Sequence, residues 1–413
     1  MQDSETLARE VVARCQTLAR FSEDVDSLRR TFLSPPMRDC HREIEKWIKP
    51  FGATSQVDAV GNLRVVYPAN NPHARRLMIG SHLDTVPNAG AYDGILGVVL
   101  AIALLGALDG RTLPFAIEIV GFSEEEGVRF GTPFIGSRAL VGSLDEETLN
   151  RQDAQGMSIR TAISDFGLYP AQIADAAMKQ DVLGYVEFHI EQGPVLDNVD
   201  RSLGVVEVIA GQSRLEFTFV GCANHAGTTP MHLRHDALAG AAEWIGAVER
   251  KAQNVSGLVA TVGTIQAKPG AANVIAGETR LSLDVRHQND GVRNTAIDYF
   301  VRQAEDIAKS RGLRVQSTVL MKQPAVAMDP LLISLIQQAI ASAGCEPHRM
   351  VSGAGHDAMI MAAKVPAAMI FLRSPGGISH DPAESVNVGD VEKAIDCGVR
   401  LLDQLALSGD FRR

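Results

Sequence analysis

The stretch LMIGSHLDTVPNAGAYDGILGVVLAIALLGAL, residues 77–108, holds the features that decide the fold. Its first part, Leu77–Ser81, is a short apolar run typical of a buried strand, and it places His82 at the strand's carboxyl end. The apolar run Gly94–Leu108 is shorter than the roughly 20 residues needed to span a bilayer, so we interpret it as a buried helix. Asp93 stands immediately before that helix. A strand, a polar loop and a buried helix in succession predict an α/β unit.

The same alternation continues on both sides of this stretch. We expect helices at residues 5–20 and 36–50, and strands at 63–67, 115–122, 185–190 and 367–372. Strands that alternate with helices predict a mixed, mostly parallel sheet flanked by helices.

A central segment has a different pattern. Its strands alternate polar and apolar residues, which indicates a sheet with one solvated face. We expect the order strand 214–219, helix 235–252, strands 258–265 and 280–286, helix 292–311 and strand 313–320. This βαββαβ order predicts a ferredoxin-like inserted domain. The predicted division is a first part of the α/β domain at 1–210, the insertion at 211–323, and a second part at 324–413.

Composition narrows the possible partners and compartments. The chain has 413 residues and a net charge of −10, with 46% hydrophobic and 21% charged residues. The acidic balance argues against non-specific binding of nucleic acid or anionic membranes. Five scattered cysteines form no CxxC pair, which favours a reducing compartment over a disulfide framework. The acidic N-terminus does not resemble a signal peptide, so we expect a cytoplasmic protein.

Five side chains of the metal-ligating types stand close to the predicted strands. Open α/β sheets bind ligands beyond the carboxyl ends of their strands, so residues far apart in sequence can meet there. Taken singly, each also fits a structural role, such as a polar loop histidine or an aspartate that caps a helix. Taken together, three imidazoles and two carboxylates suit two divalent ions that share one carboxylate. The five residues are His82, Asp93, Glu126, His189 and His380.

The acidic run Glu124–Glu126 directly follows an apolar strand. Charge runs are commonly solvated faces. Here Gly127 permits a tight turn, and adjacent carboxylates at a metal site can divide their tasks: one binds the ion while the other moves a proton.

Other residues could contact a polar substrate. Gln192 follows the strand that carries His189, and Gly355 lies in a loop of small residues beside His356, a less favoured ligand than His380. Within the insertion, His225 and Asn273 lie in turn-rich loops, and Arg286 ends a strand, where it could bind a carboxylate in bidentate fashion. The sequence has no nucleophile elbow, Walker A loop or His-Glu-x-x-His helix.

These motifs together resemble the M20 metallohydrolase superfamily, and more narrowly its hydantoinase/carbamoylase branch. The resemblance covers residues 60 to 390. Peptidases of the superfamily usually place a carboxylate where this chain has His189, which favours the amidohydrolase branch. The motifs that carry it are GSHLDTV at 80–86, FHIEQGP at 188–194, NHAGTTP at 224–230 and SGAGHDA at 352–358.

The resemblance implies roles for individual residues. One ion would be held by His82, Asp93 and His189, and a second by Asp93, Glu126 and His380. Glu125 matches the general base. Positions matching substrate contacts are Gln192, His225, Asn273, Arg286 and Gly355, with His225 also serving catalysis. In such relatives the inserted domain also mediates dimerisation, so the resemblance implies a homodimer. His225, Asn273 and Arg286 would then reach the site of the opposite subunit or close over it as a lid.

We therefore expect hydrolysis of the ureido C–N bond of N-carbamoyl-L-amino acids to amino acid, CO₂ and ammonia. Allantoate, which also carries a carboxylate and a ureido group, is the alternative substrate. An aminoacylase or dipeptidase, and a non-catalytic metal-dependent binding protein, are further alternatives. The mixed ligands suit Zn²⁺ or Mn²⁺, with Co²⁺ or Ni²⁺ also compatible.

Overall fold

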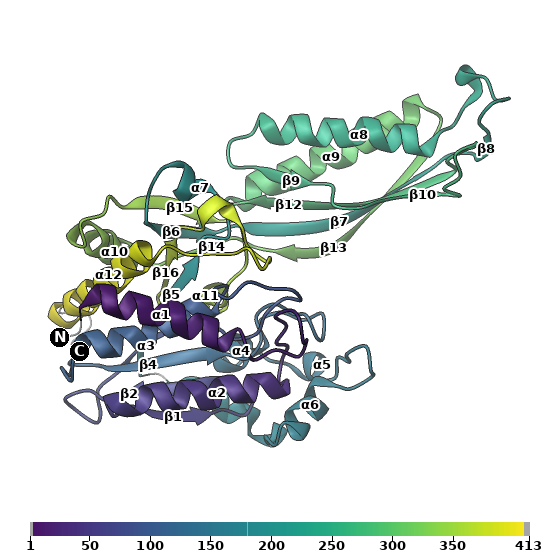
Figure 1. Ribbon diagram of the computed structural model, residues 1–413. Helices are drawn as coiled ribbons and strands as arrows, with labels where there is room; N and C mark the ends of the chain where they lie inside the picture. Colours follow the sequence, from purple (N-terminus) through teal and green to yellow (C-terminus); the bar gives the residue numbers. More distant parts are fainter. Residues whose placement is uncertain (1–2, 180, 409–413) are drawn as a thin grey trace. The chain divides into compact units, whose positions relative to one another are not determined.

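The computed structural model describes residues 3–179 and 181–408 (Figure 1). The chain forms two compact units: Met1–Glu207 together with Met328–Arg413, and Val208–Ala327. The observed boundaries at 207/208 and 327/328 lie three and four residues from the expected ones at 210/211 and 323/324.

The first unit is built on a mixed nine-stranded sheet in the order β1-β2-β4-β3-β5-β16-β6-β14, with β15 beside β6. The four central strands β4, β3, β5 and β16 run parallel, and β1, β2, β6 and β14 join antiparallel. The expected mixed sheet with a parallel centre is thereby confirmed. The strands are β1 Thr54–Val57, β2 Leu63–Tyr67, β3 Arg76–His82, β4 Ala116–Phe122, β5 Val182–Ile190, β6 Leu203–Ile209, β14 Val326–Ala327, β15 His348–Ser352 and β16 Ala367–Leu372.

Helices cover the central strands because those strands are apolar on both faces. All residues of β4, β5 and β16 are buried. Helices α1, α3, α10 and α12 pack on one another, and α3 lies against β3 and β5. The main helices are α1 Ser4–Leu18, α2 Pro35–Ile48, α3 Ile95–Leu108, α4 Ile135–Leu140, α10 Pro330–Ser342, α11 Asp357–Met361 and α12 Val388–Leu407.

Helix α3 confirms the interpretation of the apolar run as a buried core helix. Every residue from Ile95 to Gly106 is buried. Gly97 lets the helix approach β5 closely, since a Cβ there would lie 2.1 Å from the carbonyl oxygen of Phe188. Among the described residues, no helix combines the length and apolarity that a bilayer crossing requires.

Apart from the short strands β8 (Asn224–His225) and β11 (Val274–Ile275), the second unit follows the expected βαββαβ order in all but one strand. Its five-stranded antiparallel sheet runs β10-β12-β7-β13, with β9 also paired to β12, and its core includes Phe217, Trp244 and Phe300. The strand expected at 258–265 is instead two short strands that both pair with β12. The elements are β7 Gly211–Val220, α8 Ala237–Gln253, β9 Val259–Thr261, β10 Ile265–Lys268, β12 Glu278–His287, α9 Asp290–Ser310 and β13 Arg314–Gln323.

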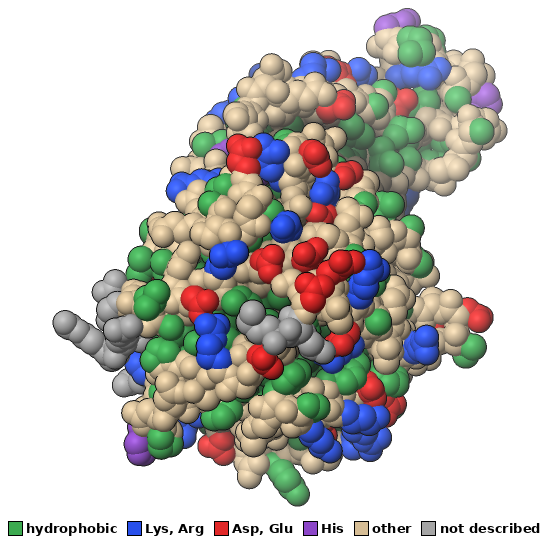
Figure 2. Space-filling view, turned by 60° about the vertical axis from the view of Figure 1, so that its left-hand side comes forward, with side chains coloured by type: hydrophobic (Ala, Val, Ile, Leu, Met, Phe, Trp, Pro, Cys, Tyr) green, Lys and Arg blue, Asp and Glu red, His purple; other side chains and the backbone are tan. Residues whose placement is uncertain are grey.

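On the face drawn in Figure 2, several acidic side chains gather near the middle, basic side chains lie around them, and hydrophobic side chains occur between the charged ones. Such a mixed surface agrees with the ordinary hydrophobic and charged fractions of the sequence.

Candidate metal centre

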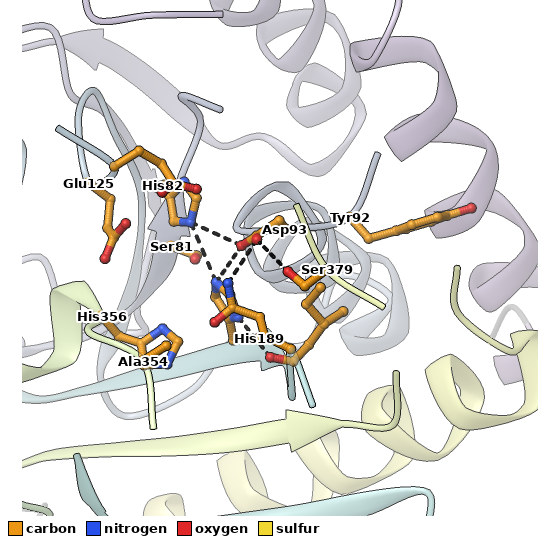
Figure 3. A network of polar contacts seen from close by, with 12 residues as sticks. Ser81, His82, Tyr92, Asp93, Glu125, His189, Ala354, His356 and Ser379 are labelled. Carbon is orange, nitrogen blue, oxygen red and sulfur yellow. Dashed lines mark hydrogen bonds and ion pairs between the residues drawn. The ribbon is translucent and has the colours of Figure 1, made fainter. Parts of the chain in front are cut away.

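Two histidines from neighbouring parallel strands face one aspartate. His82 is the last residue of β3, His189 lies near the end of β5, and Asp93 stands in the loop before α3. Asp93 Oδ1 lies 3.2 Å from His189 Nε2 and 3.5 Å from His82 Nε2, and the two nitrogens are 3.4 Å apart. Figure 3 shows both rings directed toward the Asp93 carboxylate. All three side chains are buried.

The other oxygen of Asp93 faces a second set of groups. His380 Nε2 lies 3.1 Å from Asp93 Oδ2 and 3.5 Å from Glu126 Oε1. The ligand atoms of Asp93, Glu126 and His380 all lie within 4.8 Å of one another, as do those of His82, Asp93 and His189. The structure therefore brings all five sequence-predicted metal ligands together, with Asp93 common to both sets.

Both buried imidazoles have their second ring nitrogen fixed by a backbone carbonyl. Nδ1 of His82 lies 3.0 Å from the carbonyl oxygen of Asp84, and Nδ1 of His189 lies 2.9 Å from that of Ile190. A proton on Nδ1 leaves the Nε2 lone pair directed at Asp93, the tautomer that a metal-ligating histidine needs.

The Asp84 carboxylate lies 3.4 Å from His82 Nδ1 and also contacts the acidic turn. Its two oxygens accept hydrogen bonds from the backbone N–H groups of Glu125 at 2.9 Å and Glu126 at 3.1 Å. The loop after β3 thus holds the acidic turn after β4. Gly127, at φ +71°, completes this turn and donates its N–H to Glu124.

The electrostatics of the cluster follow from dense burial of acids and imidazoles. Burial opposes ionisation of Asp93, yet the three histidines hold its pKa well below the usual range. Burial raises the pKa of Glu125 well above its ordinary value and that of Glu126 to about 7, assisted by neighbouring carboxylates. Burial and the neighbouring carboxylates therefore favour the protonated form of Glu125.

The cluster fits a divalent cation on its own geometry. Asp93 Oδ1 is buried and, among the described residues, makes no hydrogen bond of acceptable geometry although two imidazole nitrogens face it. In a tetrahedral site with metal–nitrogen bonds of about 2.0–2.1 Å, two nitrogens lie roughly 3.3–3.4 Å apart. The 3.4 Å separation of His82 and His189 Nε2 matches that spacing.

Gln192 and the loop holding Gly355 belong to the same unit. Gln192 Nε2 donates to Asp93 Oδ2 at 2.8 Å, so this carboxamide contacts the cluster directly. The neighbour of Gly355, His356, has its Nε2 2.8 Å from Ser352 Oγ, and its ring centroid lies 4.6 Å from that of His189. His356 thus supports the His189 ring from the side.

The remaining predicted residues lie in the second unit. His225 is in β8 (Asn224–His225), which pairs with β11 (Val274–Ile275), and the Asn273 carbonyl accepts the N–H of Ala226 at 2.9 Å. His225 is exposed, and its Nδ1 accepts the N–H of Gly227 at 3.0 Å. Within this unit the structure brings His225 and Asn273 together.

Arg286 lies on β12, in a different sheet from His225 and Asn273. Its guanidinium donates to both carboxylate oxygens of Asp284, at 2.8 and 3.1 Å. It therefore already makes the bidentate contact that the sequence analysis assigned to a substrate carboxylate.

Sequence reasoning missed three residues that support the cluster. Ser379 Oγ donates to Asp93 Oδ2 at 3.0 Å, Glu384 accepts the N–H of Asp93, and buried Arg30 donates to the Leu83 carbonyl at 2.7 Å. Only Ser379 had a signal, its position next to His380. Burial raises the pKa of Glu384 to about 7.

Known proteins resemble this chain over most of its length. The profile of Peptidase family M20/M25/M40 matches residues 78–404. Allantoate deiminase of Arabidopsis thaliana is 38% identical over 97% of this chain and 82% of its own length. An N-carbamoyl-L-amino acid amidohydrolase of Geobacillus stearothermophilus is 38% identical over 83% of this chain and 84% of its own.

Among solved structures, an amidase of the hydantoinase/carbamoylase family from Burkholderia multivorans superposes with a TM-score of 0.90. It is 29% identical, and the match covers 96% of this chain and 97% of that one.

Proposed function

Because this chain belongs to the peptidase family M20/M25/M40, we propose that it is a two-cation amidohydrolase that cleaves the ureido C–N bond of N-carbamoyl-L-amino acids. The observation that carries the proposal is the convergence of four ligands, His82, His189, Glu126 and His380, on Asp93, with Glu125 beside them. The named activities of relatives at 38% identity support the same reaction class.

We assign the first cation to His82, Asp93 and His189, and the second to Asp93, Glu126 and His380. Bound divalent metals lower the pKa of a coordinated water toward neutrality and polarise a carbonyl oxygen. Zn²⁺ and Mn²⁺ are the proposed ions, and Co²⁺ or Ni²⁺ also suit these ligands.

Glu125 is the proposed proton carrier. It takes a proton from the attacking water as the water oxygen bonds to the ureido carbon. It then gives that proton to the departing nitrogen as the C–N bond breaks, so ammonia leaves. The remaining carbamate releases CO₂ and the amino acid. Its burial beside His82 and Glu126 supports both steps, because a general acid–base group must lie within reach of the reacting atoms.

Polar groups of both units are assigned to the substrate. We propose that His225 stabilises the developing oxyanion, an effect typically about 3–4 kcal/mol per donor. Arg286, helped by Asn273, would bind the substrate carboxylate in exchange for Asp284. The contact of Gln192 with Asp93 supports its place beside the ureido group. Gly355 is assigned as a further substrate contact.

We also propose that the protein is a cytoplasmic homodimer whose two copies associate through the second unit. Strand β13 ends its sheet and exposes Val319 and Leu320 at 60% and 61%, which supports pairing with a second copy. The described cysteines are all free, three of them buried, which supports a reducing compartment.

Allantoate is the second candidate substrate. The alignment with Arabidopsis allantoate deiminase covers 97% of this chain, against 83% for the Geobacillus carbamoylase. Allantoate offers the same carboxylate and ureido group, so the same residues would serve it.

The test is ammonia release from purified, chelator-treated protein reloaded with Mn²⁺ or Zn²⁺. The panel contains N-carbamoyl-L-amino acids, allantoate, N-acyl amino acids and dipeptides, the last two scored by amino acid release. We expect turnover of an N-carbamoyl-L-amino acid that chelation abolishes and metal restores. Turnover of allantoate alone selects the second candidate. Turnover of only acyl or peptide substrates contradicts the ureido assignment, and silence from metal-loaded protein favours a binding protein.

A further inference from the structure

The shared aspartate lies in a loop, so something outside that loop must fix its orientation. Asp93 precedes α3 and is not part of a strand or helix. Two ions on one carboxylate require each oxygen to face its own ligand set. A small rotation of the peptide between Tyr92 and Asp93 would turn both oxygens away together.

Glu384 fixes this peptide from 291 positions away in the chain. Its Oε1 accepts the N–H of Tyr92 at 2.8 Å and that of Asp93 at 3.0 Å. The carboxyl group is 5% exposed, so little water competes for these two donors. One acceptor shared by consecutive N–H groups restricts the backbone rotations that aim the Asp93 side chain.

The loop is shaped to admit Glu384. A Cβ at Gly90 would lie 2.4 Å from Glu384 Cβ and 2.7 Å from its Oε1. Any larger residue at position 90 would therefore displace the carboxylate from the two N–H groups.

The segment that carries Glu384 also contacts the other end of Asp93. Ser379 Oγ donates to Asp93 Oδ2 at 3.0 Å, and His380 Nε2 lies 3.1 Å from the same oxygen. Residues 379–384 therefore hold Asp93 both at its backbone and at its carboxylate.

We propose that Glu384 is a positioning residue that fixes the Asp93 carboxylate as the shared ligand of two cations. The inference rests on the proposed function for the presence of the cations, and on the hydrogen bonds alone for the positioning. Glu384 acts through its acceptor oxygen, so a carboxamide with the same shape preserves the effect.

Three variants of the full chain separate positioning from charge. Glu384→Ala removes the acceptor, and Glu384→Gln keeps an oxygen at the same place. Gly90→Ala leaves Glu384 in the chain but displaces it. Asp153→Ala is a matched control, because Asp153 is a buried carboxylate whose Oδ1 also accepts two backbone N–H groups, those of Gln155 and Met157.

The first measurement is the Mn²⁺ affinity of each folded variant, by competition with a fluorescent chelator. Loss of a group that orients a metal ligand typically weakens binding about 10–100-fold. We expect that loss for Glu384→Ala and Gly90→Ala, with kcat falling more than KM rises. We expect Glu384→Gln and Asp153→Ala to stay within about threefold of the parent. Parental affinity in Glu384→Ala, or an equal loss in Glu384→Gln, overturns the proposal.

The second measurement is amide hydrogen exchange at Tyr92 and Asp93 in metal-free protein. Exchange should accelerate at both amides in Glu384→Ala and remain slow in Glu384→Gln. Unchanged exchange in Glu384→Ala overturns the positioning role. Failure of the parent protein to bind Mn²⁺ would defeat the proposed function, and the exchange rates would still decide whether Glu384 holds Asp93. Should Glu384→Ala not fold, Glu384→Asp, which withdraws the acceptor by one methylene group, takes its place.

Discussion

The residues assigned to chemistry fall into two contrasting regions. In the first unit, His82 and His189 are 2% and 1% exposed and converge on one carboxylate. In the second unit, His225 is exposed and Arg286 is paired with Asp284 on its own strand. The first region is assembled by the central strands and the loops that follow them. The second consists of side chains held by local partners, Arg286 by Asp284 and His225 through its Nδ1 by the N–H of Gly227.

The largest expected effect concerns the buried region. Glu125→Gln should lower kcat about 10²–10⁴-fold, since a carboxamide cannot carry the proton. Mn²⁺ affinity should be retained because Glu125 is not an assigned ligand. Glu124→Gln is the matched control, as its carboxamide can still accept the Gly127 N–H. Retained turnover in Glu125→Gln would remove this residue as the proton carrier.

A second prediction distinguishes a histidine that binds the cation, His189, from one that only lies beside it, His356. His189→Ala should weaken Mn²⁺ binding by more than about 100-fold, beyond the effect of losing an outer partner. His356→Gln, whose ring lies beside His189 but bonds to Ser352, should stay within about tenfold. Titration calorimetry on both variants measures the difference. Equal affinities would show that His189 is not a ligand.

The next prediction tests whether Arg286, in the second unit, binds the substrate carboxylate. Arg286→Ala should raise KM for carboxylated substrates about 10–100-fold, in line with the roughly 1.5–3 kcal/mol of a hydrogen bond to a charged group. Arg280→Ala, a substitution on the same strand, should leave KM unchanged. An unaltered KM in Arg286→Ala would mean that its partner remains Asp284 during catalysis.

The smallest expected effect is on the pH dependence of the free energy of unfolding. It again contrasts a buried side chain, His41, with an exposed one, His73. Burial, with Arg30 and Arg38 nearby, lowers the pKa of His41 from 6.5 to about 3. As the pH falls below 6.5, His41 therefore becomes protonated in the unfolded chain, whereas in the folded chain it stays neutral down to about pH 3. The free energy of unfolding should fall through this window by up to about 1.4 kcal/mol per pH unit.

Urea unfolding at pH 7.5 and 5.0 measures this loss. His41→Leu should show a smaller loss than the parent, and exposed His73→Gln should match the parent. An identical pH dependence in His41→Leu would contradict a neutral buried His41.

The sequence predicted those parts of the site whose positions follow from the geometry of the parallel sheet. His82, His189 and Glu126 each stand at or just beyond the carboxyl end of a central parallel strand, so alternating strands and helices sufficed to expect their meeting. The apolar run of α3 likewise identified a core helix without ambiguity.

Prediction failed where long-range backbone contacts decide. No sequence pattern indicates that the Glu384 and Asp84 carboxylates accept hydrogen bonds from the backbone N–H groups of distant residues. Nor does the pattern of residues 258–265 indicate that this strand is divided in two. Strand β6 and helices α10 and α12 are not among the elements expected from the sequence. Arg286 was expected to be available to substrate, and its pairing with Asp284 depends on side-chain geometry.

The most direct test of the central claim is anomalous diffraction from crystals of the full chain grown with Mn²⁺. Two peaks roughly 3.5–4 Å apart are predicted. One should contact His82 and His189, the other Glu126 and His380, and both should contact Asp93. Two peaks away from Asp93, or none at full Mn²⁺ loading, would contradict the account.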